Sequence, residues 1–289
     1  MSVLTECVVN ISEGRDLGLI GEIADRAGTT VLDIHSDPEH HRTVLTLGGE
    51  AGPVEDAVRS VAEAAVKRID LRDHDGAHPR LGAIDVVPFV PLGPDGEIAT
   101  AVEARNRFAA WAGATLELPC FLYGPERSLP EVRREAFRTL DPDSGPSTPH
   151  PTAGATAVGA RGLLVAYNIW ITVREGSEID PAAAVGLARG IASSIRTPTV
   201  RSLGLAVGTG AQVSCNLIDP HTVNLPVLFD TVAHLCEEAG GEVERAELVG
   251  LVPGELLTSV PSSRWAELDL SDDRTIETRL ESTGVAVGW

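Results

Sequence analysis

A loop between Asp73 and Asp85 carries residues whose types and spacing could do acid–base chemistry. The imidazole of His78 can exchange a proton near neutral pH, and Arg80 could hold a carboxylate. An aspartate of the same loop could orient either group. The glycines and the proline between them set a particular backbone path. The residues alone leave two interpretations open, an active site and a surface loop with incidental charges.

A second polar loop runs from Asp33 to Arg42 and holds three of the eight histidines. Imidazole and carboxylate groups together suit Zn²⁺ or Mn²⁺, so a metal site is one hypothesis. The spacing of these residues matches no standard metal-binding motif, however. Because the loop joins two predicted strands, we favour a substrate-binding loop at the strand ends and predict no metal.

A split βαβ arrangement in the first half of the chain would position both loops, because the hydrophobic period alternates between that of strands and that of helices. The predicted strands are Leu4–Ile11, Thr30–Ile34, Thr43–Gly48, Ile84–Val90 and Thr115–Tyr123. The predicted helices are Asp16–Ala27, a long helix opened by Pro53 with the apolar stripe Val54, Val58, Val61, Ala65 and Ile69, and Glu97–Ala112.

The second half repeats this order of elements. The predicted strands are Leu163–Val173, a hairpin of Ser202–Val207 and Gln212–Ile218, and Glu242–Val252. The predicted helices are one capped by Asp180-Pro181 and one marked by Leu225, Leu228, Val232 and Leu235. We therefore predict an α+β fold of two ferredoxin-like (split βαβ) lobes, with mixed sheets covered by helices. The predicted domains are residues 1–160 and 161–289.

Two segments have no clear pattern of their own. Thr139–Gly159 is rich in Pro, Gly, Ser and Thr and lies between the predicted lobes. It could be a solvated linker, but a loop of this length in a compact enzyme is often functional. The acidic tail after Pro261 could wrap the second lobe or fray.

The composition excludes several classes of function. A net charge of −19, from 23 basic and 42 acidic residues, argues against nucleic-acid and anionic-membrane partners. No apolar run approaches the ~20 residues that span a bilayer, and no basic N-terminal region signals secretion, so we expect a cytoplasmic protein. The four cysteines form no C-x-x-C pair and are expected to be buried free thiols. G-x-S-x-G, P-loop, H-E-x-x-H and G-x-G-x-x-G motifs are missing from the sequence.

Long motifs along the chain resemble the glutamate formimidoyltransferase family, including the formimidoyltransferase half of formimidoyltransferase-cyclodeaminase. Residues 6–15, ECVVNISEGR, resemble the family's ECVPNFSEGR. Residues 78–89, HPRLGAIDVVPF, resemble HPRMGALDVCPF and are the strongest match. Shorter matches follow in order at residues 122–124, 154–161, 166–168, 212–217 and 248–253. The resemblance therefore runs from about Glu6 to about Leu257.

This resemblance implies transfer of the formimidoyl group from N-formimidoyl-L-glutamate to N5 of tetrahydrofolate, the co-substrate, in histidine degradation. It implies a homodimer that needs no metal, with His78 as the general acid/base. Imidazole suits that role, because N5 must lose a proton and the glutamate nitrogen must gain one. His35, Arg42 and Arg80 are the candidates for substrate binding. The segment that matches the family's folate-binding residues consists of Gly145, Pro146, Ser147, Thr148, Pro149, His150, Pro151, Thr152, Ala153 and Gly154.

Three positions depart from the family pattern. His35 stands where the family has Asp, His41 where Asn is usual, and Ala77 where a Glu precedes the catalytic histidine. These departures leave open a related formimidoyl- or formyltransferase that acts on a different amine. A non-catalytic folate or small-ligand binding module is a third interpretation, because ferredoxin-like domains often bind small ligands.

Overall fold

The structure is a computed structural model that describes residues 3–76, 79–94, 96–174, 183–207, 210–287 and 289. The chain divides into two compact units. Unit 1 consists of Met1–Gly162 together with Leu280–Trp289, and unit 2 consists of Leu163–Arg279. We predicted a catalytic subdomain in residues 1–160 and a C-terminal formimidoyltransferase subdomain in residues 161–289. These assignments stay a prediction.

Unit 1 is built on a six-stranded sheet in the order β2-β3-β1-β4-β6-β5. The strands are β1 (Leu4–Ile11), β2 (Val31–Asp37), β3 (Arg42–Glu50), β4 (Ile84–Pro91), β5 (Cys120–Tyr123) and β6 (Thr156–Ala160). The first four pair antiparallel, whereas β6 lies parallel to both β4 and β5. Unit 1 is therefore a split βαβ sheet that two parallel strands extend.

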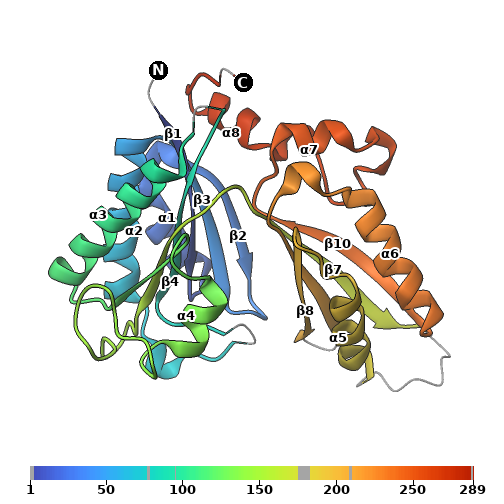
Figure 1. Cartoon of the computed structure of the whole chain (residues 1–289), viewed down its shortest axis with the longest axis horizontal. Coiled ribbons are helices and arrows are strands. Elements are labelled where there is room, and N and C mark those ends of the chain that lie inside the picture. Colours follow the sequence, from blue (N-terminus) through green and yellow to red (C-terminus); the bar gives the residue numbers. More distant parts are fainter. Residues whose placement is uncertain (1–2, 77–78, 95, 175–182, 208–209, 288) are drawn as a thin grey trace. The chain divides into compact units, whose positions relative to one another are not determined.

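Helices α1 (Leu17–Ala24), α2 (Ala51–Arg68) and α3 (Ile98–Thr115) cover one face of this sheet (Figure 1). The predicted stripe of the second helix is confirmed, since Val54, Val58, Val61, Ala65 and Ile69 are all buried. Two 3-10 helices follow α1 and α2, namely η1 (Asp25–Thr30) and η2 (Leu71–Asp73). A fourth helix, α4 (Leu129–Glu135), joins a separate core cluster with β5 and β6.

One expectation for unit 1 is wrong. The strand predicted from Thr115 begins only at Cys120, because an alanine-rich run carries α3 on to Thr115. Of the two interpretations of Thr139–Gly159, the solvated linker does not hold for its end, which forms β6 between β4 and β5. β6 consists of small residues, which fit there because a Cβ on Gly159 would lie 2.1 Å from the Tyr123 ring. Glycine and alanine are depleted in strands, so this short run gives only a weak strand signal.

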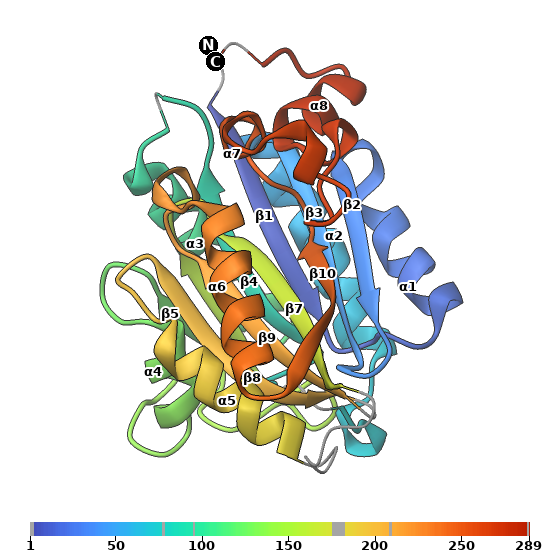
Figure 2. The ribbon, with the colours of Figure 1, turned by 90° about the vertical axis from the view of Figure 1, so that its right-hand side faces the viewer.

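Unit 2 is a four-stranded antiparallel sheet in the order β10-β7-β9-β8. Its elements are β7 (Val165–Val173), α5 (Ala184–Ser194), β8 (Val200–Val207), β9 (Gly210–Leu217), η4 (Pro220–Thr222), α6 (Leu225–Glu238) and β10 (Gly241–Val249). Both helices pack on one face of this sheet (Figures 1 and 2). This βαββαβ order confirms the predicted α+β, ferredoxin-like class. The predicted cap Asp180-Pro181 and the hairpin centre at 208–209 lie outside the described residues.

The tail after Pro261 neither frays nor simply wraps the second unit. It continues from α7 (Gly254–Ser259) through η5 (Ser262–Arg264), η6 (Asp272–Arg274) and α8 (Ile276–Ser282). Leu268 and Leu270 are buried in the core of unit 2. The last ten residues belong to unit 1, where a Cβ on Gly93 would lie 2.7 Å from the Trp289 ring.

The prediction for the cysteines is confirmed, because all four are buried free thiols. Burial also raises the pKa of each thiol. In the part of the chain that the structure describes, no helix is both long enough and apolar enough to cross a membrane.

Candidate active site

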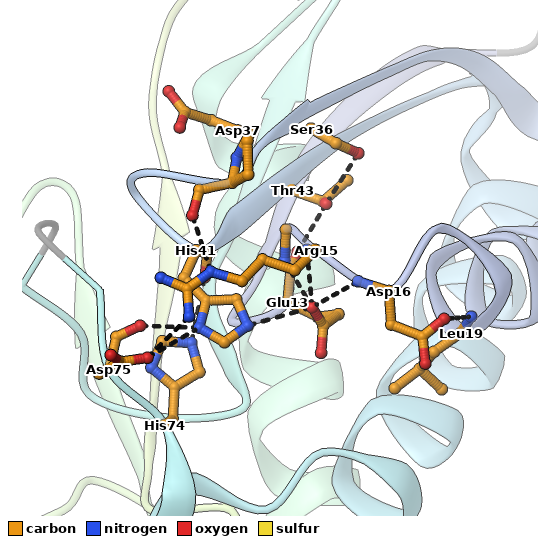
Figure 3. A network of polar contacts seen from close by, with 12 residues as sticks. Glu13, Arg15, Asp16, Leu19, Ser36, Asp37, His41, Thr43, His74 and Asp75 are labelled. Carbon is orange, nitrogen blue, oxygen red and sulfur yellow. Dashed lines mark hydrogen bonds and ion pairs between the residues drawn. The ribbon is translucent and has the colours of Figure 1, made fainter. Parts of the chain in front are cut away.

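Three segments of unit 1 meet around a polar network, drawn in Figure 3. They are the residues after β1, the β2–β3 turn and the loop before β4. The Ser12 hydroxyl donates to the Gly82 carbonyl at 2.8 Å, and its amide donates to the Ala83 carbonyl at the same distance. A Cβ on Gly76 would lie 2.6 Å from the His40 carbonyl oxygen, so the loop and the turn are in close contact. The three segments therefore form one surface.

The β2–β3 turn orients His41. The Asp37 carboxylate accepts the amide protons of Glu39 at 2.8 Å and of His40 at 2.9 Å, which closes a tight turn. His41 follows with a φ of 50°, in the left-handed region that a residue with a Cβ seldom adopts. In Figure 3 its ring lies between Glu13 and Asp75.

Glu13 is the hub of the network. Its Oε1 accepts the backbone N–H groups of Gly14 at 2.9 Å, Arg15 at 2.8 Å and Asp16 at 3.0 Å. Burial by itself would raise the pKa of Glu13, but these amides and the adjacent His41 outweigh it and lower the pKa. Glu13 is therefore an ionised carboxylate that only accepts hydrogen bonds.

Both ring nitrogens of His41 face acceptors. Nδ1 lies 2.7 Å from the Asp75 carbonyl oxygen, and Nε2 lies 3.1 Å from Glu13 Oε1. Neither partner has a proton to donate. Donation from both nitrogens would satisfy both acceptors, and Glu13 would then be the counter-ion of the ring.

His74 stacks on His41, with ring centroids 4.0 Å apart and planes 13° from parallel. Its Nε2 donates to the His41 carbonyl at 3.1 Å. Burial lowers the pKa of His74, and the positive charges of Arg80 and His41 lower it further. Its Nδ1 is buried, and among the described residues it has no hydrogen-bond partner.

A hollow of about 10 Å³, room for about one water molecule, lies at this junction. It is lined by Ser12, His40, His41, Arg42, His74, Arg80 and Asp85. The structure thus brings together two of the predicted substrate-binding residues, Arg42 and Arg80. His35 is not among the lining residues described; it pairs with Val44 in the sheet, as does Asn10 from the other side.

Arg42 and Arg80 are each held by a neighbour. The Arg42 Nε donates to the Asn10 side-chain oxygen at 2.9 Å, and burial lowers the pKa of Arg42 to about 10 although Asp85 opposes this. Arg80 donates to the His74 carbonyl. Both remain cationic at neutral pH, so the hollow presents positive charge to a carboxylate.

Asp85 supports the loop before β4. It is 1% exposed and pairs with Arg133 of α4 at 2.6 Å. Its Oδ1 also accepts the Leu81 amide at 2.6 Å, and Arg133 donates to the Pro79 carbonyl at 3.0 Å. The pair therefore fixes the backbone on which Arg80 stands.

The predicted catalytic residue, His78, lies outside the described residues, as does Ala77. The predicted folate segment, Gly145–Gly154, belongs to unit 1. Its first half is exposed, and its end is bonded to the loop before β4. The Ala83 amide donates to the Ala153 carbonyl at 2.8 Å, and Gly82 pairs with Gly154. The His150 Nδ1 accepts the Ala153 amide at 3.0 Å, which closes the turn.

Sequence reasoning did not single out Glu13, His74 or Arg133 as site residues. A carboxylate immediately after a buried strand was a usable signal for Glu13, because strand ends are common sites for polar function. His74 and Arg133 gave no local signal, since their roles depend on contacts across the fold. Within the described ranges no three His, Cys, Asp or Glu side chains come close enough to hold a metal ion. That no metal is needed stays a prediction.

Comparison with known proteins identifies relatives along nearly the whole chain. A family model described as "Formiminotransferase domain, N-terminal subdomain" matches residues 4–161. The glutamate formimidoyltransferase of Streptococcus pyogenes serotype M1 is 34% identical over 280 residues, which cover 90% of this chain and 92% of that protein. The glutamate formimidoyltransferase of Thermoplasma acidophilum is 32% identical over 285 residues, covering 89% and 90%.

A longer relative is the formimidoyltransferase-cyclodeaminase of Sus scrofa. It is 34% identical over 275 residues, which cover 88% of this chain and 51% of that protein. The chain thus spans about half the length of this relative. The family model matches more than half of the chain, and relatives match about nine-tenths of it at more than 30% identity. The chain therefore belongs to the formiminotransferase family.

Proposed function

We propose that the chain transfers the formimidoyl group of N-formimidoyl-L-glutamate to N5 of tetrahydrofolate. The observation that carries this proposal is the similarity to two proteins named glutamate formimidoyltransferase over about nine-tenths of the chain. The site supports it, because both substrates carry carboxylates and the hollow is lined by Arg42 and Arg80. We also propose, as the family resemblance implies, that the protein is a cytoplasmic homodimer that acts in histidine degradation.

The reaction moves one proton from the acceptor to the donor. The N5 lone pair attacks the amidinium carbon, and the C=N π electrons move onto the terminal nitrogen. N5 then loses its proton, and the glutamate nitrogen gains one. The C–N bond to glutamate breaks, and the amidinium re-forms on N5. His78 is the proposed acid–base group, and such help is typically worth ~10²–10⁴-fold in rate.

The segment Gly145–Gly154 is the proposed folate site. Its end is tied to the loop that carries Arg80, because the Ala155 amide donates to the Leu81 carbonyl at 3.0 Å and the Leu71 amide to the Thr152 carbonyl at 2.9 Å. A folate held on this segment would therefore lie beside the positive charges of the hollow. His35, Arg42 and Arg80 are the proposed substrate-binding residues.

A His78→Ala variant tests the acid–base role. We expect its turnover number to fall ~10²–10⁴-fold, because the proton transfers of the reaction would lose their proposed acid–base group. The measurement is a spectrophotometric assay of 5-formimidoyl-tetrahydrofolate. The control is His234→Ala, since His234 is exposed on α6 and pairs only with Glu238 of the same helix among the described residues. Unchanged turnover in His78→Ala would exclude the role, and no product from the unaltered protein would exclude the reaction.

A transferase that acts on a different amine is the second candidate. His41 favours it, because an imidazole, which can carry a charge, stands beside the hollow where the family usually has an uncharged Asn. Calorimetric titration with tetrahydrofolate separates the candidates. Binding with turnover supports the first, and binding without turnover of formimidoyl-glutamate supports the second or a non-catalytic binding module. Absence of binding excludes tetrahydrofolate as the acceptor.

A further inference from the structure

His74 holds a basic nitrogen that the proposed mechanism has not used. Its Nδ1 is buried and, among the described residues, has no hydrogen-bond partner, although the ring lines the hollow. Buried polar atoms without partners are rare in folded proteins, and each asks for an explanation. The hollow has room for about one water molecule, so a ligand group or a water placed there could satisfy this nitrogen.

The neighbours of His74 decide where its proton lies. The His41 carbonyl accepts from Nε2, so the single proton of a neutral ring is on Nε2 and the lone pair is on Nδ1. A second proton on Nδ1 would put two cationic rings face to face, with centroids 4.0 Å apart. Glu13 and the Asp75 carbonyl face the two ring nitrogens of His41. The contacts of His74 therefore favour a neutral ring with its lone pair on Nδ1.

Charged groups of both signs face the stack from each packed segment. Glu13 and Arg15 come from the residues after β1, and Asp37, His40 and Arg42 come from the β2–β3 turn. Asp75, Arg80 and Asp85 come from the loop and the start of β4. Arg15 pairs with Asp75 at 2.8 Å, and Asp85 pairs with Arg133 of α4. Besides burial, the charges of Arg80 and His41 lower the pKa of His74, and Glu13 opposes them.

We propose that Nδ1 of His74 is a second proton acceptor of this site, which takes the proton of the attacking amine through a water molecule held in the hollow. This inference rests on the proposed function. The N5–C bond forms, the N5 proton passes to the water as the water gives a proton to Nδ1, and the water is regenerated. His78 can then start protonated and deliver its own proton to the departing glutamate nitrogen. The two proton transfers thus have separate groups.

The protonation state of His74 tests the inference without any turnover. Nitrogen-15 NMR of histidine-labelled protein distinguishes a ring nitrogen that carries a proton from one that does not, and His74→Gln assigns the signal. We expect an unprotonated Nδ1 and a protonated Nε2 for His74 at neutral pH, with two protonated nitrogens for His41. A protonated Nδ1 on His74 at neutral pH would overturn the proposal, whatever the protein's activity.

Chemical rescue separates a proton acceptor from a space-filling ring. In His74→Ala we expect a ~10²-fold lower turnover number with little change in KM. Added imidazole should restore part of the rate. 1,2,4-Triazole, which has nearly the same shape but is a far weaker base, should not. Equal rescue by both compounds, or wild-type turnover without either, would overturn the proposal. The control is His234→Gln, since His234 is an exposed residue on α6 of unit 2 that pairs with Glu238.

The pH profile gives a third readout. The base must be unprotonated, so kcat/KM should fall on the acidic side as His74 gains its second proton. Because the pKa of His74 is lowered, that fall should lie below the usual range of histidine. In His74→Gln this acidic limb should vanish, while a limb due to His78 stays. An unaltered acidic limb would count against the proposal. If the unaltered protein makes no product, the proposed function fails, and the NMR result alone decides about His74.

Discussion

At the scale of single residues, one carboxylate organises the candidate site. Glu13 accepts three backbone N–H groups and the Nε2 of His41 through one oxygen. Hydrogen bonds to an ionised group are about twice as strong as neutral ones. Glu13 therefore holds both the backbone after β1 and one ring nitrogen of His41 in place. His41 in turn stacks on His74.

We predict that Glu13→Gln lowers the free energy of unfolding by about 1–3 kcal/mol, because a neutral amide weakens four charge-assisted hydrogen bonds. Urea denaturation followed by fluorescence measures the change. The matched control is Glu22→Gln, since Glu22 is 59% exposed and pairs with Arg68 at the surface. A surface pair contributes little, so the control should stay within about 0.5 kcal/mol. Equal losses in both variants would show that Glu13 is not a hub.

At the scale of elements, the sequence predicted the strands and helices that depend on local hydrophobic periodicity. The strand Leu4–Ile11 was predicted with the bounds that the structure shows, because a short segment in which apolar residues predominate is typical of a buried strand. The stripe of α2 was predicted because apolar residues recur at the helical period. β6 was missed, because small residues become a strand there only through the neighbours β4 and β5.

The junction of the loop before β4 with the segment that ends at Gly154 leads to a prediction. A Cβ on Gly82 would lie 1.9 Å from the Ala155 carbonyl oxygen and 2.6 Å from that of Ala153. Gly82→Ala should therefore force two backbones apart and cost about 2–3 kcal/mol of stability. We expect a lower melting temperature and weaker binding of tetrahydrofolate, measured by calorimetry.

Gly162→Ala is the control for this variant, because its added methyl group would meet no described atom within 4 Å. A Gly82→Ala protein with the melting temperature and folate affinity of the control would contradict the close packing of the junction. A Gly82→Ala protein with a lower melting temperature but an unchanged affinity for folate would show that this packing matters for stability and not for folate binding.

At the scale of the whole molecule, the chain ends in the unit where it began. Residues Leu280–Trp289 belong to unit 1, although Leu163–Arg279 form unit 2. Leu280 is buried, and a Cβ on Gly48 of β3 would lie 3.3 Å from its side chain. The last residues therefore contribute to the stability of the sheet that positions the candidate site.

We predict that Leu280→Ala destabilises unit 1 by about 2–4 kcal/mol, because it leaves a cavity beside β3. Hydrogen exchange followed by mass spectrometry should show faster exchange in β3 and β2. Leu203→Ala serves as the control, since Leu203 is 58% exposed on β8 and its truncation should change little. Unchanged exchange in β3 after Leu280→Ala would show that the tail does not support this sheet.

The sequence by itself determined the α+β class, the order of most elements and the family, because these depend on local periodicity and on long motifs such as residues 78–89. It also drew attention to the two loops that meet at the candidate site. Only the tertiary structure decided which of their residues work together. Glu13, His41 and His74 lie far apart in the sequence, and no local propensity encodes a hydrogen bond or a ring stack between them. Those contacts exist because β1, the β2–β3 turn and the loop before β4 meet at one end of a single sheet.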